Sequence, residues 1–242
     1  TGRKQVLLVS DQEVLSSSLT QYSDYMKSAK KSSSKDGAAM VTRVGKKIAA
    51  ATEQYLRNNG LESEIKNFAW EFNLVNDPQV NAFCMPGGKI VVYEGLMQLV
   101  SSDDELAVVV GHEVAHAVAK HSNERMSQQL MAQYGAQILG QALSNKSAAV
   151  QKIGASVYGL GAQYGVMLPF SRKHESEADY MGLVFMAMAG YNPAVAVNFW
   201  QKMSAGKSGS TPEFMSTHPS DATRINEIKQ HLPEIEKYRV KK

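Results

Sequence analysis

The sequence predicts an α+β fold, predominantly helical with a small sheet, as a single domain over residues 1–242. Three observations support this prediction. Segments with helical periodicity and N-terminal capping residues dominate the chain. Short alternating runs gather within residues 68–95. The 242 residues, 43% of them hydrophobic, suffice for one sizeable core.

The N-terminal region, residues 1–37, is predicted to contain a strand, a helix and a loop. The apolar run QVLLV at 5–9 favours a short strand. Ser10 and Glu13 follow at capping-box spacing, so a helix should begin there. The lysine- and serine-rich run at 30–37 is typical of a loop and should end that helix.

The next elements are a helix and a sheet. A helix over 38–59 should end at Gly60. FAWEFNLVND (68–77) alternates like a strand, and NAFCMPGGKIVVYEG (81–95) predicts two strands around a Pro-Gly-Gly turn. Together these three strands should form a small antiparallel sheet.

The remaining elements are helical. Ser102 and Glu105 form a second capping box, which opens a central helix. The later expectations are helices over 126–143, from the SNKS break to Pro169, over 172–189, from Pro193 and from Pro219 to Leu232, and then a tail over 233–242.

Composition excludes some classes of protein. The formal net charge of +3 gives no reason to expect a nucleic-acid partner. The longest uncharged stretch, 153–171, is too polar and glycine-rich for a membrane span. Cys84 is the only cysteine, so no internal disulfide can form, which suits a cytosolic protein or an exported protein without disulfides.

The central helix contains the motif GHEVAHAVAKH at 111–121. His112 and His116 are four residues apart, so they share one helical face and can converge on one point. Glu113 can reach water held at that point. The valines and alanines around them predict a buried helix, where each unpaired polar group costs about 1–3 kcal/mol. A zinc ion would give all three a partner, although two core histidines satisfied by neighbours remain an alternative.

A catalytic zinc site takes a third protein ligand. Glu124 would lie about 12 Å beyond His116 along a continued helix, out of reach. Cys84 is more simply a packed small hydrophobe. Glu175 and Asp179 are four apart on a second helix, so Glu175 can bind the metal while Asp179 orients a ligating imidazole. The alternative for this pair is a solvated acidic face.

Four further polar residues receive predictions. Glu177 lies on another face than Asp179 and should point to solvent. His121 should be structural, a cation at the end of the central helix. His218 is predicted to face the zinc, either donating to the oxyanion or binding the metal, with a helix cap as the alternative. Arg224 should anchor substrate or form a plain salt bridge.

Four blocks of sequence, HEVAH, SRKHESEAD, NAFCMPGGKIVVYEGL and THPSDATRI, carry a resemblance to a known family. The chain resembles the HtpX and CAAX-prenyl-protease group of zinc metallopeptidases, which includes Oma-type mitochondrial and bacterial envelope proteases. The resemblance covers about residues 6–232. It implies a zincin-like gluzincin fold, with zinc ligands and a general base at the residues already singled out: His112, His116 and Glu175 as ligands, Glu113 as base and Asp179 as their support.

The resemblance also implies how substrate binds. Asn81, Ala82 and Phe83 would lie on an edge strand over the cleft, to which an extended peptide can add. The alternative for this segment is an ordinary core strand.

The implied function is a zinc-dependent endopeptidase that acts on unfolded or misassembled polypeptides of the bacterial envelope. The expected location is the periplasm or, as a lipoprotein, the outer membrane, with peripheral or lipid-anchored membrane association and no predicted oligomeric state. The alternative function is a chaperone-like or binding module whose zinc site stays closed. Glu113 favours the enzyme, because a structural zinc site needs no general base.

Overall fold

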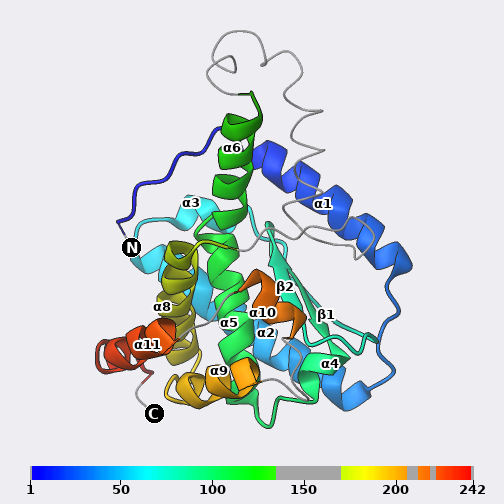
Figure 1. The fold of residues 1–242 in the computed structure, drawn as a ribbon, viewed down its shortest axis with the longest axis vertical. Helices are drawn as coiled ribbons and strands as arrows, with labels where there is room; N and C mark the ends of the chain where they lie inside the picture. Colours follow the sequence, from blue (N-terminus) through cyan, green and yellow to red (C-terminus); the bar gives the residue numbers. More distant parts are fainter. Residues whose placement is uncertain (1, 135–169, 206–211, 219–221, 241–242) are drawn as a thin grey trace.

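The computed structural model describes residues 2–134, 170–205, 212–218 and 222–240. Over these residues the chain is mostly helical and carries one three-stranded sheet, as the sequence predicts. The strands are β1 (Glu71–Val75), β2 (Ala82–Met85) and β3 (Lys89–Tyr93). The helices (Figure 1) are α1 (Asp11–Ser28), α2 (Lys35–Asn58), α3 (Glu62–Ile65), α4 (Glu94–Met97), α5 (Asp103–Val118), α6 (His121–Tyr134), α8 (Arg172–Met188), α9 (Val195–Ala205), α10 (Glu213–Thr217), α11 (Ala222–Ile235) and the 3₁₀ turn η3 (Glu236–Tyr238).

The sheet is mixed, which corrects the prediction of an antiparallel sheet. β3 lies between the other two strands, antiparallel to β2 and parallel to β1. The β2–β3 hairpin matches the prediction, and Gly87 and Gly88 take the positive φ angles that its turn requires. β1 is parallel because the chain leaves it, enters the sheet at the far edge as β2, and returns between the two.

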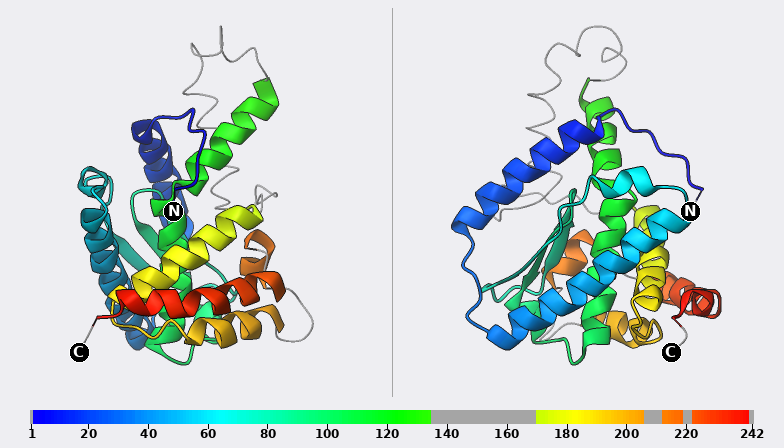
Figure 2. Two further views of the ribbon diagram at one scale, coloured as in Figure 1. Left: turned by 90° about the vertical axis from the view of Figure 1, so that its left-hand side faces the viewer. Right: turned by 180° about the vertical axis from the view of Figure 1, so that it is seen from behind.

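Both faces of the sheet are covered by helices. On one face Leu74, Ile90 and Val92 belong to the main core, together with residues of α2 and α5. On the other face Tyr22 of α1 packs against Val91. Figures 1 and 2 show α8, α9 and α11 on the side of α5 away from the sheet. α5 is therefore the central helix, buried from Leu106 to His116 as its apolar sequence predicts.

The segment before α1 is not the strand that its apolar sequence predicts. Instead, side chains of α6 hold it. The Leu8 N–H donates to Ser127 Oγ over 2.8 Å, and Asn123 Nδ2 donates to the Val9 carbonyl over 2.9 Å. A five-residue apolar run cannot show whether a strand or a polar helix face will satisfy its backbone.

Helix starts follow their capping residues. Ser10 and Glu13 form the predicted capping box at α1. Ser102 accepts from the Glu105 N–H, but the Glu105 carboxylate accepts from the Ser101 N–H over 2.7 Å, so this second box is not reciprocal.

In three other helices a local hydrogen bond or turn sets the first residue. α2 begins inside the predicted loop, because Ser34 caps it. α6 begins at His121, directly after Lys120, whose positive φ of 57° separates it from α5. α9 begins at Val195 rather than at Pro193, since the preceding turn is closed by other hydrogen bonds.

The C-terminal end differs from the prediction. α11 continues through Pro233 to the fully buried Ile235 and is followed by η3, so the predicted helix end at Leu232 is wrong and residues 233–238 are not part of a tail. A proline within a helix removes a hydrogen bond, and burial of Ile235 offsets that loss. The helical segments predicted within 135–169 and the helix start at Pro219 lie outside the described residues.

Among the described residues, no helix combines the length and the apolar character that crossing a membrane requires.

Candidate metal centre

Two helices bring the predicted ligands together. α5 buries His112, Glu113 and His116, each at most 3% exposed. α8 begins after the Ser171 cap and places Glu175 in its first turn, also buried. The α5 and α8 backbones pack directly against each other, so the faces that carry these side chains meet.

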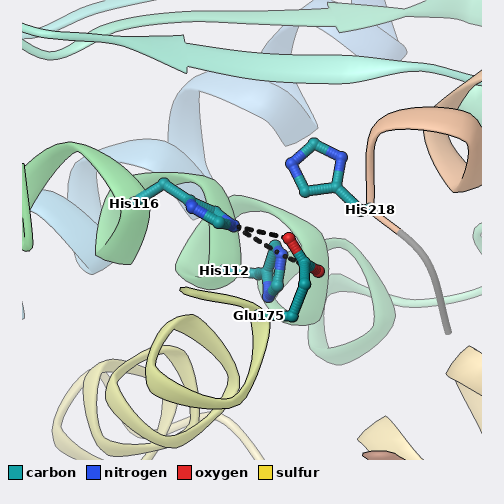
Figure 3. Close-up of side chains that lie close together, drawn as sticks. All are labelled: His112, His116, Glu175 and His218. Atoms are coloured by element: carbon teal, nitrogen blue, oxygen red, sulfur yellow. Dashed lines mark hydrogen bonds and ion pairs between the residues drawn. The ribbon is translucent and has the colours of Figure 1, made fainter. Parts of the chain in front are cut away.

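The side chains of His112, His116, Glu175 and His218 converge (Figure 3), each offering one ligand atom, all within 4.8 Å of one another. The Nε2 atoms of His112 and His116 are 3.0 Å apart. The Glu175 carboxylate oxygens lie 3.4 Å from His112 Nε2 and 3.3 Å from His116 Nε2. The spacing and the mixture of nitrogen and oxygen atoms suit a metal ion.

Buried atoms without hydrogen bonds point to the same position. Within the described part of the chain, Glu113 Oε1, both Glu175 carboxylate oxygens and His218 Nε2 are buried and make no hydrogen bond. Buried polar groups are normally satisfied. A cation bound among the converging atoms would satisfy the oxygens of Glu175 and the nitrogen of His218, so the residues fit a metal.

The Glu175 carboxylate is held in its ionised form. Burial alone would raise its pKa, but the positive charge of the neighbouring groups, above all the permanently charged Arg224, outweighs that effect and holds the pKa well below the usual range. Arg224 Nη1 lies 2.8 Å from Glu175 Oε2 and forms an ion pair with it, without the geometry of a hydrogen bond. An ionised carboxylate is the form that a metal requires.

Asp179 orients the first histidine. Its Oδ1 lies 2.9 Å from His112 Nδ1. A carboxylate can only accept, so His112 donates its Nδ1–H, which leaves Nε2 as the ring nitrogen that faces the other ligand atoms. Arg224 donates to both Asp179 oxygens, over 2.5 and 2.8 Å, and fixes the carboxylate in turn.

Arg224 is therefore placed behind the centre rather than along an open cleft. It is 5% exposed and pairs with Asp179 and Glu175, which favours the salt-bridge alternative over substrate binding. Its guanidinium also lies over the Trp200 ring, 4.8 Å from the centroid.

Glu113 lies beside the four converging side chains but is not one of the candidate metal ligands. Burial raises the pKa of Glu113 to about 8, against a lowering by His112. Its Oε1 is 3.4 Å from His218 Nε2, and a backbone hydrogen bond from Cys84 reaches the carboxylate. A carboxyl group with a pKa near neutral can both accept and release a proton.

His218 forms the C-terminal cap of α10 and is not a cap of the last helix. Its Nδ1 lies 3.2 Å from the Phe214 carbonyl and 2.9 Å from Thr217 Oγ1. A carbonyl only accepts, so Nδ1 carries the proton and Nε2 turns a lone pair toward the centre. Burial lowers the pKa of His218 to about 3, which keeps the ring neutral. This tautomer favours metal binding over donation to an oxyanion.

Two predictions about polar residues are wrong. Glu177 does not point to solvent, because its side chain is 9% exposed and its Oε2 lies 3.0 Å from His121 Nε2. His121 is not a cation at the end of α5. It opens α6, and burial lowers its pKa. Its Nδ1 lies 2.8 Å from Nδ1 of His116. The sequence did offer a signal for this contact, because His116 and His121 are only five residues apart in the same motif.

The predicted substrate strand, β2, lies at the edge of the sheet. The Tyr93 N–H donates to the Asn81 carbonyl, so in this antiparallel pair the backbone groups of Ala82 and Cys84 point away from β3. Asn81 and Ala82 are buried, and Phe83 packs against Tyr25 of α1. Cys84 is buried in the main core, as expected for a packed small hydrophobe, and is not among the converging ligands.

Comparisons with known proteins match this chain to metallopeptidases. A family model described as Peptidase family M48 matches residues 42–232. The mitochondrial metalloendopeptidase OMA1 of Schizosaccharomyces pombe is 36% identical over 205 residues, which cover 81% of this chain and 53% of that protein. OMA1 of Arabidopsis thaliana is 40% identical over 168 residues, 69% of this chain and 33% of that protein.

A bacterial relative is also found. The beta-barrel assembly-enhancing protease of Yersinia pestis is 33% identical over 174 residues, 67% of this chain and 36% of that protein. The chain thus spans about half, or about a third, of the length of these relatives.

Proposed function

The chain belongs to peptidase family M48, and from this premise we propose that it is a zinc-dependent endopeptidase. The observation that carries the proposal is the convergence of His112, His116 and Glu175 beside the buried carboxyl group of Glu113. Three ligands and an adjacent general base are the combination that metal-assisted hydrolysis needs. We propose that these functional groups belong to a single domain over residues 1–242.

The spacing of the ligand atoms supports zinc. Two atoms bound to a tetrahedral zinc ion at about 2.0–2.1 Å lie about 3.3 Å apart. The three contacts among His112, His116 and Glu175 measure 3.0, 3.3 and 3.4 Å. Two imidazoles and one carboxylate are also a ligand set that catalytic zinc commonly uses.

The chemistry divides between the metal and the chain. When bound, zinc would polarise the scissile carbonyl and acidify a water molecule. Glu113 would take a proton from the attacking water and deliver it to the leaving amine. Its pKa, raised to about 8 by burial, suits both transfers near neutral pH. Asp179 would keep His112 in the ligating tautomer throughout.

We propose that the substrate is an extended polypeptide that adds to β2 near Asn81, Ala82 and Phe83. The outward backbone groups of β2 support this mode, because they can pair with any peptide sequence in register. Recognition of the backbone requires an unfolded segment. It therefore agrees with unfolded or misassembled proteins as the substrate class.

The cellular setting is part of the same proposal. The names of the relatives refer to mitochondria and to the assembly of beta-barrels. We propose a location in the bacterial cell envelope, periplasmic or lipid-anchored at the outer membrane, with misassembled envelope proteins as the targets.

A second candidate is favoured by His218. Its Nε2 lone pair faces the three ligands, so it would supply a fourth protein ligand and leave no position for water. In that state the protein would bind polypeptides without cleaving them. The enzyme and the closed binding module are then two states of one centre, which differ in the position of His218.

Zinc content and casein cleavage test the proposal together, because casein offers extended backbone throughout. The wild type should hold about one zinc ion and cleave casein, whereas Glu113→Gln should hold the same zinc and not cleave. A wild-type protein that holds no zinc would contradict the proposal that zinc is the bound metal. Equal cleavage by both proteins contradicts Glu113 as the base.

A further inference from the structure

We propose that Glu177, acting through His121, is a positioning residue that fixes the tautomer of the metal ligand His116, and that Arg3 anchors this relay. The sequence places Glu177 outside the site, and the proposed mechanism does not use His121. The inference rests on the proposed function in one respect only, which is that His116 binds the metal.

The geometry forms a continuous chain of contacts. His116 turns Nε2 toward the other ligands and Nδ1 toward His121, with 2.8 Å between the two Nδ1 atoms. His121 turns its other nitrogen, Nε2, to Glu177 Oε2 at 3.0 Å. The rings of His116 and His121 are 3% and 0% exposed, so their hydrogen bonds are made within the protein.

The direction of each hydrogen bond follows from the carboxylate. Glu177 can only accept, so His121 donates its Nε2–H. A neutral imidazole carries one proton, so Nδ1 of His121 must accept. His116 then donates its Nδ1–H, which leaves the lone pair on Nε2, the atom that faces the metal position.

The neutral state of both rings is consistent with their surroundings. Both rings are buried, and burial disfavours a charged imidazole. The opposite tautomer of His116 would place a hydrogen against the metal and two lone pairs against each other at 2.8 Å. With a metal at the centre, the arrangement that places the His116 proton on Nδ1 therefore satisfies each contact of the relay.

Arg3 fixes the far end of the relay. Its Nε donates to Glu177 Oε2 over 2.6 Å, and its two Nη atoms donate to the Glu124 carboxylate over 2.8 and 2.6 Å. Gln5 adds a bond to the Ala119 carbonyl at the end of α5. The segment that precedes α1 is thereby joined to the ligand helix.

The two ligating histidines then share one design. His112 contacts the carboxylate of Asp179 directly, and Arg224 holds that carboxylate in place. His116 reaches an arginine-held carboxylate through one additional ring. Hydrogen-bond partners of ligands typically change metal affinity or activity about 10–100-fold, which sets the expected size of the effect.

The first test replaces His121 with phenylalanine, which keeps a ring but leaves the His116 Nδ1–H without an acceptor. The matched control is His174→Phe. His174 is equally buried, stacks on His121 at 4.4 Å and contacts Glu124, but is not part of the relay. Zinc affinity, measured by competition with a chelator, should fall about 10–100-fold in His121→Phe and stay within about threefold in His174→Phe. Equal losses in the two variants would overturn the proposal.

A second pair of variants distinguishes loss of the relay from loss of the fold. Glu177→Gln keeps an oxygen that can accept from His121, whereas Glu177→Met has similar size and no such oxygen. Zinc affinity should fall about tenfold or more in Glu177→Met and stay near wild type in Glu177→Gln. If the two variants lose equal affinity, the carboxylate acts through its charge on Arg3 and the relay is wrong.

Tautomers measured in the metal-free protein separate this inference from the proposed function. Nitrogen-15 NMR of the imidazoles should show His116 protonated at Nδ1 in the wild type and in Glu177→Gln, and a mixture in Glu177→Met. A wild type that binds no zinc but shows this pattern contradicts the proposed function alone. A wild type that binds zinc while its metal-free form has the proton on His116 Nε2 contradicts the relay alone.

Discussion

Gly111 of α5 and Gly182 of α8 lie backbone to backbone. A Cβ atom on Gly111 would stand 3.0 Å from the Gly182 carbonyl oxygen, and one on Gly182 would stand 2.9 Å from the His112 nitrogen. The atoms in the way belong to the backbone, so neither helix can accommodate a side chain by rotating a rotamer. This contact sets the distance between the helix of His112 and the helix of Glu175.

Gly182→Ala should therefore destabilise the protein. Overpacking typically costs about 1–3 kcal/mol, which exceeds the ~1 kcal/mol that alanine contributes in helix propensity. The net decrease in the free energy of unfolding, measured with urea, should reach about 2 kcal/mol, and zinc affinity should fall with it. Ser176→Ala on the same helix is the control. A Gly182→Ala protein as stable as the wild type would show that the two helices can move apart freely.

Glu113→Gln should keep its fold while losing hydrolysis. Loss of a general base usually costs about 10²–10⁴-fold in rate. Burial raises the pKa of Glu113 to about 8, so the ionised form is unfavourable in the fold and a neutral amide should not destabilise it. The turnover of a fluorogenic peptide and the melting temperature check both statements. A melting temperature several degrees lower would contradict the second.

Glu175→Gln and Asp179→Asn should differ in severity. Glu175→Gln weakens one of three ligands, so most zinc affinity and all activity should be lost. Asp179→Asn only loosens the His112 ring, so zinc affinity or activity should fall about 10–100-fold. Zinc retained after dialysis against a weak chelator ranks the two variants. The reverse order would mean that Asp179, not Glu175, is the ligand.

His218→Ala should increase peptide cleavage. The Nε2 of His218 has a lone pair toward the ligands, so its removal should open a coordination position for water. His231→Ala, on α11 and outside the site, is the matched control. Casein cleavage per bound zinc is the measurement. A fall in cleavage with zinc retained would instead identify His218 as a donor to the oxyanion.

Acid should destabilise the metal-free protein partly through Glu124. Hydrogen bonds from Arg3 lower the pKa of Glu124 to about 2, from an ordinary value of 4.5. The unfolded chain therefore takes up the proton first, and the free energy of unfolding falls as the pH drops from about 4.5 toward 2. Urea denaturation across this range should show a smaller decrease in Glu124→Gln. The same decrease in both proteins would exclude a role for this ion pair.

The parts of the centre that follow from local spacing are predictable from sequence. His112 and His116 are four residues apart on one helix, and Glu175 and Asp179 repeat that spacing on another. Such pairs share a face wherever the helix packs, so their placement does not depend on the tertiary structure. The helix caps at Ser10 and Ser171 are equally local.

The predictions from the sequence that were wrong concern contacts between helices and strands. The position of Glu177 depends on how α8 meets the start of α6, and on Arg3 arriving from the far end of the chain. Rotation about the helix axis separates Glu177 from Asp179 correctly, but does not show what packs there. The parallel pairing of β1 has the same cause, because strand direction depends on the path of the connection and not on the alternation of side chains.

The free edge of β2 has a consequence for solubility. If β2 binds substrate peptides as proposed, it must also avoid pairing with a copy of itself, because an unpaired edge is a template for aggregation. In this chain the outward N–H groups are occupied. The Ala82 N–H donates to Asn81 Oδ1 over 2.9 Å, and the Cys84 N–H is held by the Glu113 carboxylate. Under the proposed binding mode each peptide must displace these internal acceptors, so the proposed general base, Glu113, also protects the edge against pairing with other strands.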